Sequence, residues 1–400
     1  MKQKFAAELL DNLNHNILPY WIDTMTDPRG GYYGRRDGHD RLDADAPKGA
    51  ILNARILWSF SAAYLAMRNP AYLQAADRAY NYIVDHFVDR EYGGTFWSVN
   101  PDGSPADTKK QFYAIGFMIY GLSEYYRASG CREALRLALD LFDVIETHSL
   151  DTEKEGYIEA TTRSWEPIAD MRLSDRDANA SKTMNTHLHI IEGYTNLLRT
   201  LRDLPEYDKE CRRVDEATRR LLRLFLDRIT NPVTHHLTLF FDDDWRKVDD
   251  AESYGHDIEA SWLLLETAEV IADESLYAET LERTRHIALA GLQGRCADGS
   301  MVYERLADGR YLNNKDWWVQ AENVIGQLYL WRYHGLDEWL PRAYQSWRYI
   351  ADHIVDSEGE WYWARLADGS IDRADDKAGF WKCPYHNSRM TLEASRLLLN

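Results

Sequence analysis

Six stretches of the chain carry apolar residues at positions i, i+3, i+4 and i+7, the spacing of a helix with a buried face. They cover residues 51–67, 113–128, 185–201, 259–273, 318–334 and 388–399. Amphipathic segments lie between them, for example at 71–88 and 132–148. The pattern predicts an all-α protein in which apolar helices alternate with amphipathic ones.

A second kind of segment separates the helix pairs. Short aromatic and apolar pieces surround Asp-Gly or similar turn signals, which is typical of small β-hairpins. These segments cover residues 30–41, 93–109, 156–167, 236–250, 299–314 and 359–373. Each hairpin is therefore expected to connect one helix pair to the next.

The unit of hairpin and helix pair recurs six times. The residues at the heads of the apolar helices follow one another at intervals of 58 to 72 residues: Arg55, Tyr113, Asn185, His256, Trp318 and His386. No terminal capping unit is evident, and the apolar helices are too hydrophobic for an open surface, so a closed ring fits better than an open solenoid. We predict one domain, residues 1–400, with the hairpins and helix heads at one mouth.

Composition narrows the classes of partner. The chain has 400 residues, a formal net charge of −18, and 45% hydrophobic residues. An acidic protein of this kind is a poor match for nucleic acid or an anionic membrane. The arginines of 211–228 alternate with leucine and indicate a solvated helix face. No signal-peptide pattern, no membrane-length apolar run and no paired cysteines occur, so we expect a cytoplasmic monomer.

Titratable residues gather at the helix heads. His256 and Glu259 are three residues apart, on one helical face, where the carboxylate is able to orient the imidazole; a simple surface pair is the alternative. His386 precedes the last apolar helix, and Asn185 and His189 share a face of another. Histidines also suggest a metal, but no HExxH or structural-zinc spacing occurs, so we expect no metal.

Aromatic residues and one arginine complete the set of candidates. The chain has 14 tryptophans, and Trp318 lies four residues before Glu322. Flat rings beside polar groups suit the apolar faces of sugars. Arg55 heads an otherwise apolar helix and needs an anionic partner, such as an enediolate. No nucleotide-binding or nucleophile-elbow motif is present, so we expect no cofactor.

Five stretches resemble the cellobiose 2-epimerases of the N-acylglucosamine 2-epimerase superfamily. They are KGAILNARILW, KTMNTHLHIIEGYTNL, SYGHDIEASWLL, WWVQAE and WKCPYHNSRM, and the resemblance runs over nearly the whole chain. It implies an (α/α)6 barrel. It also implies C2 epimerisation of a β-1,4-linked disaccharide such as cellobiose, without cofactor or metal.

The resemblance also implies roles for individual residues. His256 and His386 would be the acid/base pair, with Glu259 supporting His256. Arg55 and His189 would bind oxygens around C1 and C2. The pocket residues would be Tyr113, Asn185, Trp318 (or Trp317), Trp381 and, with weaker backing, Glu322.

Rival functions stay open at this point. The same enediolate chemistry acts on other substrates in mannose 2-epimerases, N-acylglucosamine 2-epimerases and aldose–ketose isomerases. A glycoside hydrolase with a similar barrel would use two carboxylates, and the histidines would then have no catalytic role. A non-catalytic sugar-binding protein would explain the tryptophans alone.

Overall fold

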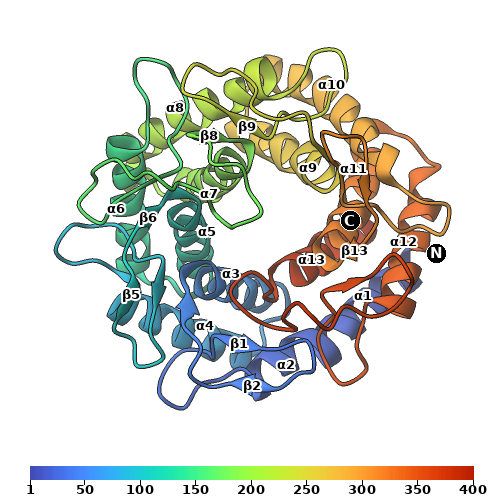
Figure 1. Ribbon diagram of the computed structural model, residues 1–400, viewed down its shortest axis with the longest axis horizontal. Coiled ribbons are helices and arrows are strands. Elements are labelled where there is room, and N and C mark those ends of the chain that lie inside the picture. The colour runs from blue at the N-terminus through green and yellow to red at the C-terminus, as the bar shows by residue number, and fades with distance from the viewer.

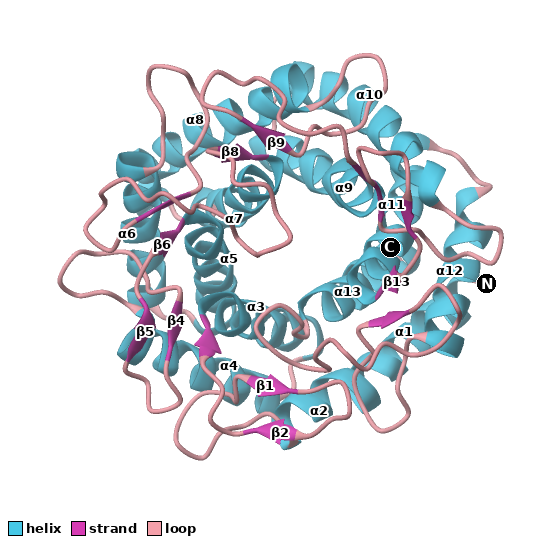
Figure 2. Cartoon of the chain, viewed as in Figure 1, coloured by secondary structure: helices cyan, strands magenta, loops and turns pink.

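The helices form two concentric rings in the computed structural model, which describes residues 1–400 (Figures 1 and 2). The inner ring contains α3 (Ala50–Met67), α5 (Phe112–Ser129), α7 (Met184–Arg202), α9 (Tyr254–Ile271), α11 (Trp317–His334) and α13 (Tyr385–Leu399). The outer ring contains α1 (Lys2–Asn12), α2 (Leu18–Asp23), α4 (Pro70–Tyr82), α6 (Arg132–His148), α8 (Asp208–Leu224), α10 (Glu274–Gly291) and α12 (Trp339–His353). The predicted (α/α)6 barrel is therefore confirmed.

Short helical turns complete the outer ring. The π-helical turns η1 (Leu13–Ile17), η2 (Ile83–Phe87) and η4 (Phe225–Ile229) follow α1, α4 and α8, and the 3₁₀ turns are η3 (Pro205–Tyr207) and η5 (Leu292–Gly294). The two ends of the chain form the sixth pair, because α1 packs against α13. Helix α13 also contacts α3, and this contact closes the inner ring.

The inner helices are apolar because they are covered on every side. Residues 50 to 63 of α3 are all buried, between the neighbouring inner helices and the outer ring. By length and composition alone α3 is able to span a membrane, contrary to our expectation that no segment would qualify, but 78% of it is buried inside the barrel. Its hydrophobicity is accounted for by the core.

Glycines bring two of the inner helices unusually close together. A Cβ atom on Gly193 of α7 would lie 2.5 Å from the carbonyl oxygen of Gly116 on α5, and one on Gly116 would lie 2.8 Å from the carbonyl oxygen of His189. Real Cβ atoms do not approach so closely, so only glycine fits at either position. The contact fixes α7, and with it His189, against α5.

Small sheets tie the units together at one mouth of the barrel. The strands are β1 (Arg35–Arg36), β2 (Leu42–Asp43), β3 (Lys48–Gly49), β4 (Ser98–Val99), β5 (Pro105–Asp107), β6 (Lys110–Gln111), β7 (Ala160–Thr161), β8 (Lys182–Thr183), β9 (Phe240–Phe241), β10 (Glu252–Ser253), β11 (Glu304–Arg305), β12 (Tyr311–Leu312), β13 (Lys315–Asp316) and β14 (Ala364–Arg365). The strand before an inner helix pairs antiparallel with a strand of the next unit, as β3 does with β4 and β6 with β7. The hairpins thus join neighbouring units into a collar.

A buried ion pair recurs beneath this collar. Lys48 contacts Asp27, Lys110 contacts Asp89 and Lys182 contacts Asp151, each at 2.8 Å, and the three lysine side chains are at most 1% exposed. Each lysine lies in the strand that leads into an inner helix, and each aspartate lies in a turn after an outer helix. The pairs hold the helix heads in place around the mouth.

Candidate active site

The predicted site residues converge at the mouth where the inner helices begin. They line a cavity of about 370 Å³, here called the inner chamber. Its walls include Arg55, Tyr113, Asn185, His189, His256, Glu259, Trp318, Trp381 and His386. Of the ten residues predicted, only Glu322 does not line it.

Glu322 lies directly behind His386. Its carboxylate accepts hydrogen bonds from His386 Nδ1 at 2.7 Å and from Trp262 Nε1 at 2.9 Å. A carboxylate without a proton only accepts, so Nδ1 of His386 carries the hydrogen and Nε2 keeps its lone pair. Nε2 has no hydrogen-bond partner in the protein. The expected sugar contact of Glu322 is therefore corrected: it orients the histidine from behind.

The predicted support of His256 by Glu259 is wrong. Nδ1 of His256 lies 2.7 Å from Oγ of Ser253, the residue that caps α9. Glu259 is one turn further along and accepts a hydrogen bond from Arg389 at 2.7 Å instead. The capping serine starts α9 at Tyr254, five residues before the apolar pattern, and this places His256 in the first turn within reach of the cap.

His256 and His386 are both neutral at neutral pH. Burial is the largest cause and lowers the pKa of His256 and of His386 to about 3. For His386, the adjacent Glu322 carboxylate opposes that shift without cancelling it. For His256 the charge of Glu322, and not that of Glu259, opposes the shift.

Arg55 and Tyr113 form a polar wall of the inner chamber. Nη2 of Arg55 donates to the Tyr113 hydroxyl at 2.9 Å, and Nη1 donates to the carbonyl of Trp381 at 3.3 Å. Its Nε is buried and has no partner. The guanidinium also lies 4.2 Å from the ring centroid of Phe117, which supports it from the side. A cation with a free donor is thus held beside the chamber.

His189 and Asn185 present further polar groups from α7. His189 is 2% exposed, and its Nδ1 donates to Glu192 at 2.8 Å. Burial, followed by the charge of Arg55, lowers its pKa well below the usual value, so this ring is neutral too. Oδ1 of Asn185 is buried without a hydrogen-bond partner, and the residue lines the inner chamber.

Two of the tryptophans supply flat surfaces. The ring of Trp318 lies 4.8 Å from His256 and 5.6 Å from His386, between the two histidines of the neighbouring helices α9 and α13. Trp317 is 3% exposed and packs against Trp363 at 4.5 Å. Trp318 is thus the more exposed of the two rings, and both line the inner chamber. Trp381 lies on another side of the chamber.

A buried charge network beneath the chamber was missed by the sequence analysis. Arg389, in the quoted motif WKCPYHNSRM, donates to Glu192 at 2.5 Å, to Glu259 at 2.7 Å and to Glu322 at 2.6 Å. Glu259, Glu322 and His386 offer ligand atoms within 4.8 Å of one another, the geometry of a metal site. The guanidinium already occupies one oxygen of each carboxylate and supplies the compensating charge.

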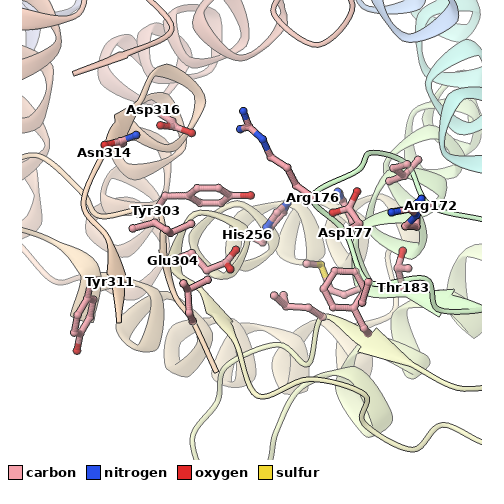
Figure 3. A pocket seen from close by; sticks show the side chains of 18 of the residues that line it. Arg172, Arg176, Asp177, Thr183, His256, Tyr303, Glu304, Tyr311, Asn314 and Asp316 are labelled. Carbon is pink, nitrogen blue, oxygen red and sulfur yellow. The ribbon is translucent and has the colours of Figure 1, made fainter. Parts of the chain in front are cut away.

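The inner chamber opens into a larger outer one of about 780 Å³ (Figure 3). The loop 162–181, which connects β7 and β8, forms one side of it, and Tyr303 and Glu304 form another. Arg176 extends across this space and lies 3.4 Å from Asp375 on the opposite loop. The periodicity of the helices carried no signal for these residues, because they lie in irregular loops.

An (α/α)6 barrel whose mouth holds histidines, an arginine and tryptophans around one chamber has the parts of a carbohydrate-active enzyme. The model of the N-acylglucosamine 2-epimerase (GlcNAc 2-epimerase) family matches residues 31–388. The chain belongs to this family, and it is a carbohydrate epimerase.

Known proteins of the same length resemble it closely. It is 50% identical over 396 residues to the cellobiose 2-epimerase of Bacteroides fragilis, covering 98% of this chain and 99% of that protein. The solved structure of a cellobiose 2-epimerase from Bacillus thermoamylovorans B4167 matches with a TM-score of 0.92 at 36% identity, over 98% and 99% of the two chains. A D-mannose isomerase structure matches with a TM-score of 0.83 over 99% and 98%, at 18% identity, and shows the shared fold alone.

Proposed function

We propose that the protein inverts C2 of the reducing-end glucose of cellobiose and related β-1,4-linked disaccharides, giving 4-O-β-D-glucosyl-D-mannose. The reaction proceeds by ring opening and proton transfer through a cis-enediol(ate). The proposal needs no cofactor or metal. The close similarity to proteins named cellobiose 2-epimerases supports the choice of substrate.

The observation that carries the proposal is the pair of neutral histidines at the chamber, of which His386 is buried and His256 is half-buried. His256 and His386 come from α9 and α13, lie on two sides of Trp318, and each engage Nδ1 outside the sugar space. Inversion at a carbon requires a base on one face and an acid on the other. His386 holds its hydrogen on Nδ1 and offers the Nε2 lone pair as the base, whereas His256, with Nδ1 accepting from the Ser253 hydroxyl, carries its hydrogen on Nε2 and serves as the acid.

The proton transfers balance without any co-reactant. One histidine assists opening of the pyranose ring, which gives the aldehyde at C1. One histidine then takes the C2 proton, and the electron pair of the C–H bond forms the enediolate with its charge on O1. Rotation about C2–C3 presents the other face of C2, and the second histidine gives its Nε2 hydrogen to C2. On ring closure the O5 hydroxyl returns a proton to the second histidine, and the first histidine passes the proton it took from C2 to O1, so both histidines end neutral.

The two histidines are not equivalent. His386 donates to the carboxylate of Glu322, which stabilises its imidazolium, whereas His256 meets only the neutral hydroxyl of Ser253. A carboxylate partner strengthens a histidine as a base. We therefore assign the C2 proton of the glucose epimer to His386 and the returning proton to His256.

The enediolate needs an electrostatic partner as well as a base. A positioned acid or base raises the rate by about 10²–10⁴-fold, and a hydrogen-bond donor to the oxyanion lowers the activation barrier by about 3–4 kcal/mol more. Arg55 lines the chamber with a fixed charge and an unpartnered Nε, so it is the group we assign to the developing oxyanion. His189 and Tyr113 lie beside it, and their ring centroids are 4.8 Å apart.

The size of the cavity supports a disaccharide over a monosaccharide. The reducing-end ring would occupy the inner chamber of about 370 Å³, against Trp318 and Trp381. The second ring would extend into the outer chamber of about 780 Å³. Binding cavities for small molecules usually measure about 300–1,000 Å³, so the inner chamber alone suffices for one sugar.

A hydrolytic reaction has weaker support from the geometry. Two carboxylates would have to flank a glycosidic bond. Glu322 is 0% exposed behind His386, and one guanidinium binds both Glu322 and Glu259. The two acids therefore lie on the same side of the chamber.

A proton NMR time course in D₂O tests the proposal. The enzyme is incubated with cellobiose, with mannose and with N-acetylglucosamine in separate runs. Deuterium at C2 together with 4-O-glucosyl-mannose, and no cleavage of the glycosidic bond, is the expected result. Release of free glucose would show that the protein is a glycoside hydrolase instead of an epimerase. Deuterium exchange on mannose alone would support the same proton-transfer chemistry and rule out the disaccharide as the substrate.

A further inference from the structure

Arg389 occupies a central position that the proposed reaction does not use directly. It lies on α13, one turn after Tyr385, and is 2% exposed. It does not line the inner chamber. Instead it borders a cavity of about 590 Å³ near the opposite mouth of the barrel, whose walls include Trp58 and Trp262. The guanidinium therefore forms a partition between the sugar site and the far side of the ring.

Three carboxylates from three inner helices converge on this guanidinium. Glu192 comes from α7, Glu259 from α9 and Glu322 from α11, and all three are at most 2% exposed. The ring of Tyr385 lies 4.2 Å from the guanidinium carbon, and its hydroxyl is a further hydrogen-bond partner. The other charged or titratable groups around it are Arg55, Tyr120, His189 and His386.

Each of these carboxylates is connected to the sugar site through a different contact. Glu322 accepts the Nδ1 proton of His386, and Glu192 accepts that of His189. Glu259 lines the inner chamber itself. Arg389 therefore contacts the carboxylates that orient His386 and His189. It also contacts Glu259, the only one of the three acids that lines the inner chamber.

Charge balance distinguishes the three acids. Three ionised carboxylates around one guanidinium in a dry interior would leave uncompensated negative charge, which is strongly unfavourable. Glu322 accepts from Arg389, His386 and Trp262, whereas Glu259 accepts from Arg389 alone. The acid with fewest donors is the easiest to protonate. Consistently, burial, followed by the charge of Glu322, raises the pKa of Glu259 to about 8.

We propose that Arg389 is a positioning residue that sets the charges of the active site. It holds Glu322 and Glu192 as the anions that orient His386 and His189, and it leaves Glu259 as a neutral carboxyl group facing the sugar. A neutral carboxyl group donates a hydrogen bond, which suits a sugar oxygen that gains negative charge. The role in turnover rests on the proposed epimerase activity, whereas the arrangement of charges does not.

The substitutions Arg389→Met and Arg389→Lys test the positioning role. With methionine, we expect kcat to fall at least 100-fold and KM to change less than threefold, because Arg389 does not touch the sugar space. Loss of its positive charge also raises the pKa of His386, so the acid limb of the kcat/KM profile moves to higher pH by at least one unit. Lysine keeps the charge and should leave that limb close to its wild-type position while kcat falls about tenfold.

Arg199→Met provides the matched control. Arg199 forms a partly buried pair with Glu266 at 2.7 Å near the same far cavity, without contact to the histidines' partners. It should lower the melting temperature and leave both kcat and the acid limb unchanged. If Arg389→Met lowers kcat equally at every pH, the residue is only structural and the proposal fails. If the methionine variant does not fold, the lysine variant decides the question. A folded Arg389→Lys protein whose acid limb lies away from the wild-type position would also overturn the proposal.

Infrared spectroscopy tests the charge arrangement without turnover. At pH 7 the difference spectrum of wild-type minus Glu259→Gln protein should show the carbonyl band of a protonated buried carboxyl group; the difference is needed because burial also raises the pKa of Glu159 and of Asp316 to about 7. A difference spectrum without that band would overturn the assignment. Wild-type protein that shows the band but does not epimerise any sugar would overturn the proposed function and leave the charge arrangement standing.

Discussion

Glu322→Gln removes one charge and almost no volume, and its effect on His386 is calculable from the contacts. Glutamine offers one acceptor oxygen and one NH₂ group, whereas the carboxylate meets three donors, from His386, Arg389 and Trp262. His386 and Arg389 both donate to Oε1, and Trp262 donates to Oε2. If the NH₂ group replaces Oε1, the guanidinium of Arg389 is left facing another donor and Nδ1 of His386 becomes the acceptor. Nε2 then carries the hydrogen and no longer acts as a base. If it faces Trp262 instead, two donors oppose each other at a cost of about 1–3 kcal/mol.

The lost charge sets the size of the effect on the rate. An imidazolium and a carboxylate with charge centres about 4 Å apart attract by about 4 kcal/mol at an effective dielectric constant of about 20. Each 1.36 kcal/mol of barrier is tenfold in rate, so kcat should fall by about 10³-fold. KM should stay within about threefold of the wild-type value, because Glu322 does not line the inner chamber.

Initial rates of epimerisation, followed with the C2 deuterium exchange by NMR, give kcat and KM for the variant. Glu146→Gln is the control, because Glu146 accepts from two tyrosines, Tyr157 and Tyr194, on the outer side of the barrel. It should destabilise the protein by about 1–3 kcal/mol and leave kcat within about twofold. A Glu322→Gln variant that keeps more than a tenth of the wild-type kcat would refute the orienting role of this carboxylate.

Five further substitutions follow from the same geometry. His256→Ala and His386→Ala should each lower kcat by about 10²–10⁴-fold with an unchanged circular dichroism spectrum; retention of more than about a tenth of the rate contradicts the two-base assignment. Ser253→Ala should lower kcat about fivefold to tenfold and the free energy of unfolding by about 1 kcal/mol, because both the partner of His256 and the cap of α9 are lost; an unchanged kcat means that the serine does not hold the ring. Trp381→Ala should raise KM about tenfold with little change in kcat, since a stacking surface is removed; an unchanged KM identifies this ring as core. Burial lowers the pKa of His187 to about 4, so the unfolded state binds the proton first and stability falls as pH drops from 6.5 to 4, by about 3 kcal/mol; urea unfolding of His187→Gln should show a weaker dependence over this range, and an equal slope refutes the assignment.

The errors in the predicted site have a common physical origin. Residues at i and i+3 share a helix face, and this relation suggested that Glu259 orients His256. The structure instead pairs His256 with its own cap residue and Glu259 with Arg389, 130 positions away. Local spacing shows which groups are able to meet. It does not show which partner from another helix competes for the same atom.

Glu322 illustrates the same limit from the other side. Its spacing from Trp318 suggested a sugar contact, since both residues lie on one face of α11. In the barrel that face is divided: Trp318 borders the chamber, while Glu322 turns toward α13 and meets His386. The role of a polar residue on a buried helix depends on which neighbour covers it, and that is a property of the ring.

The sequence by itself determined the kinds and order of the helices, the sixfold repetition and the identity of nine residues that line the chamber. Apolar periodicity and turn signals are local properties, and a motif shared with a family carries its contact residues with it. Only the tertiary structure decided how the ring closes, with α1 against α13, and how the charges pair beneath the sugar site. Those features join residues far apart in the chain, such as Arg389 and Glu192, and their energies depend on burial and on distances between helices.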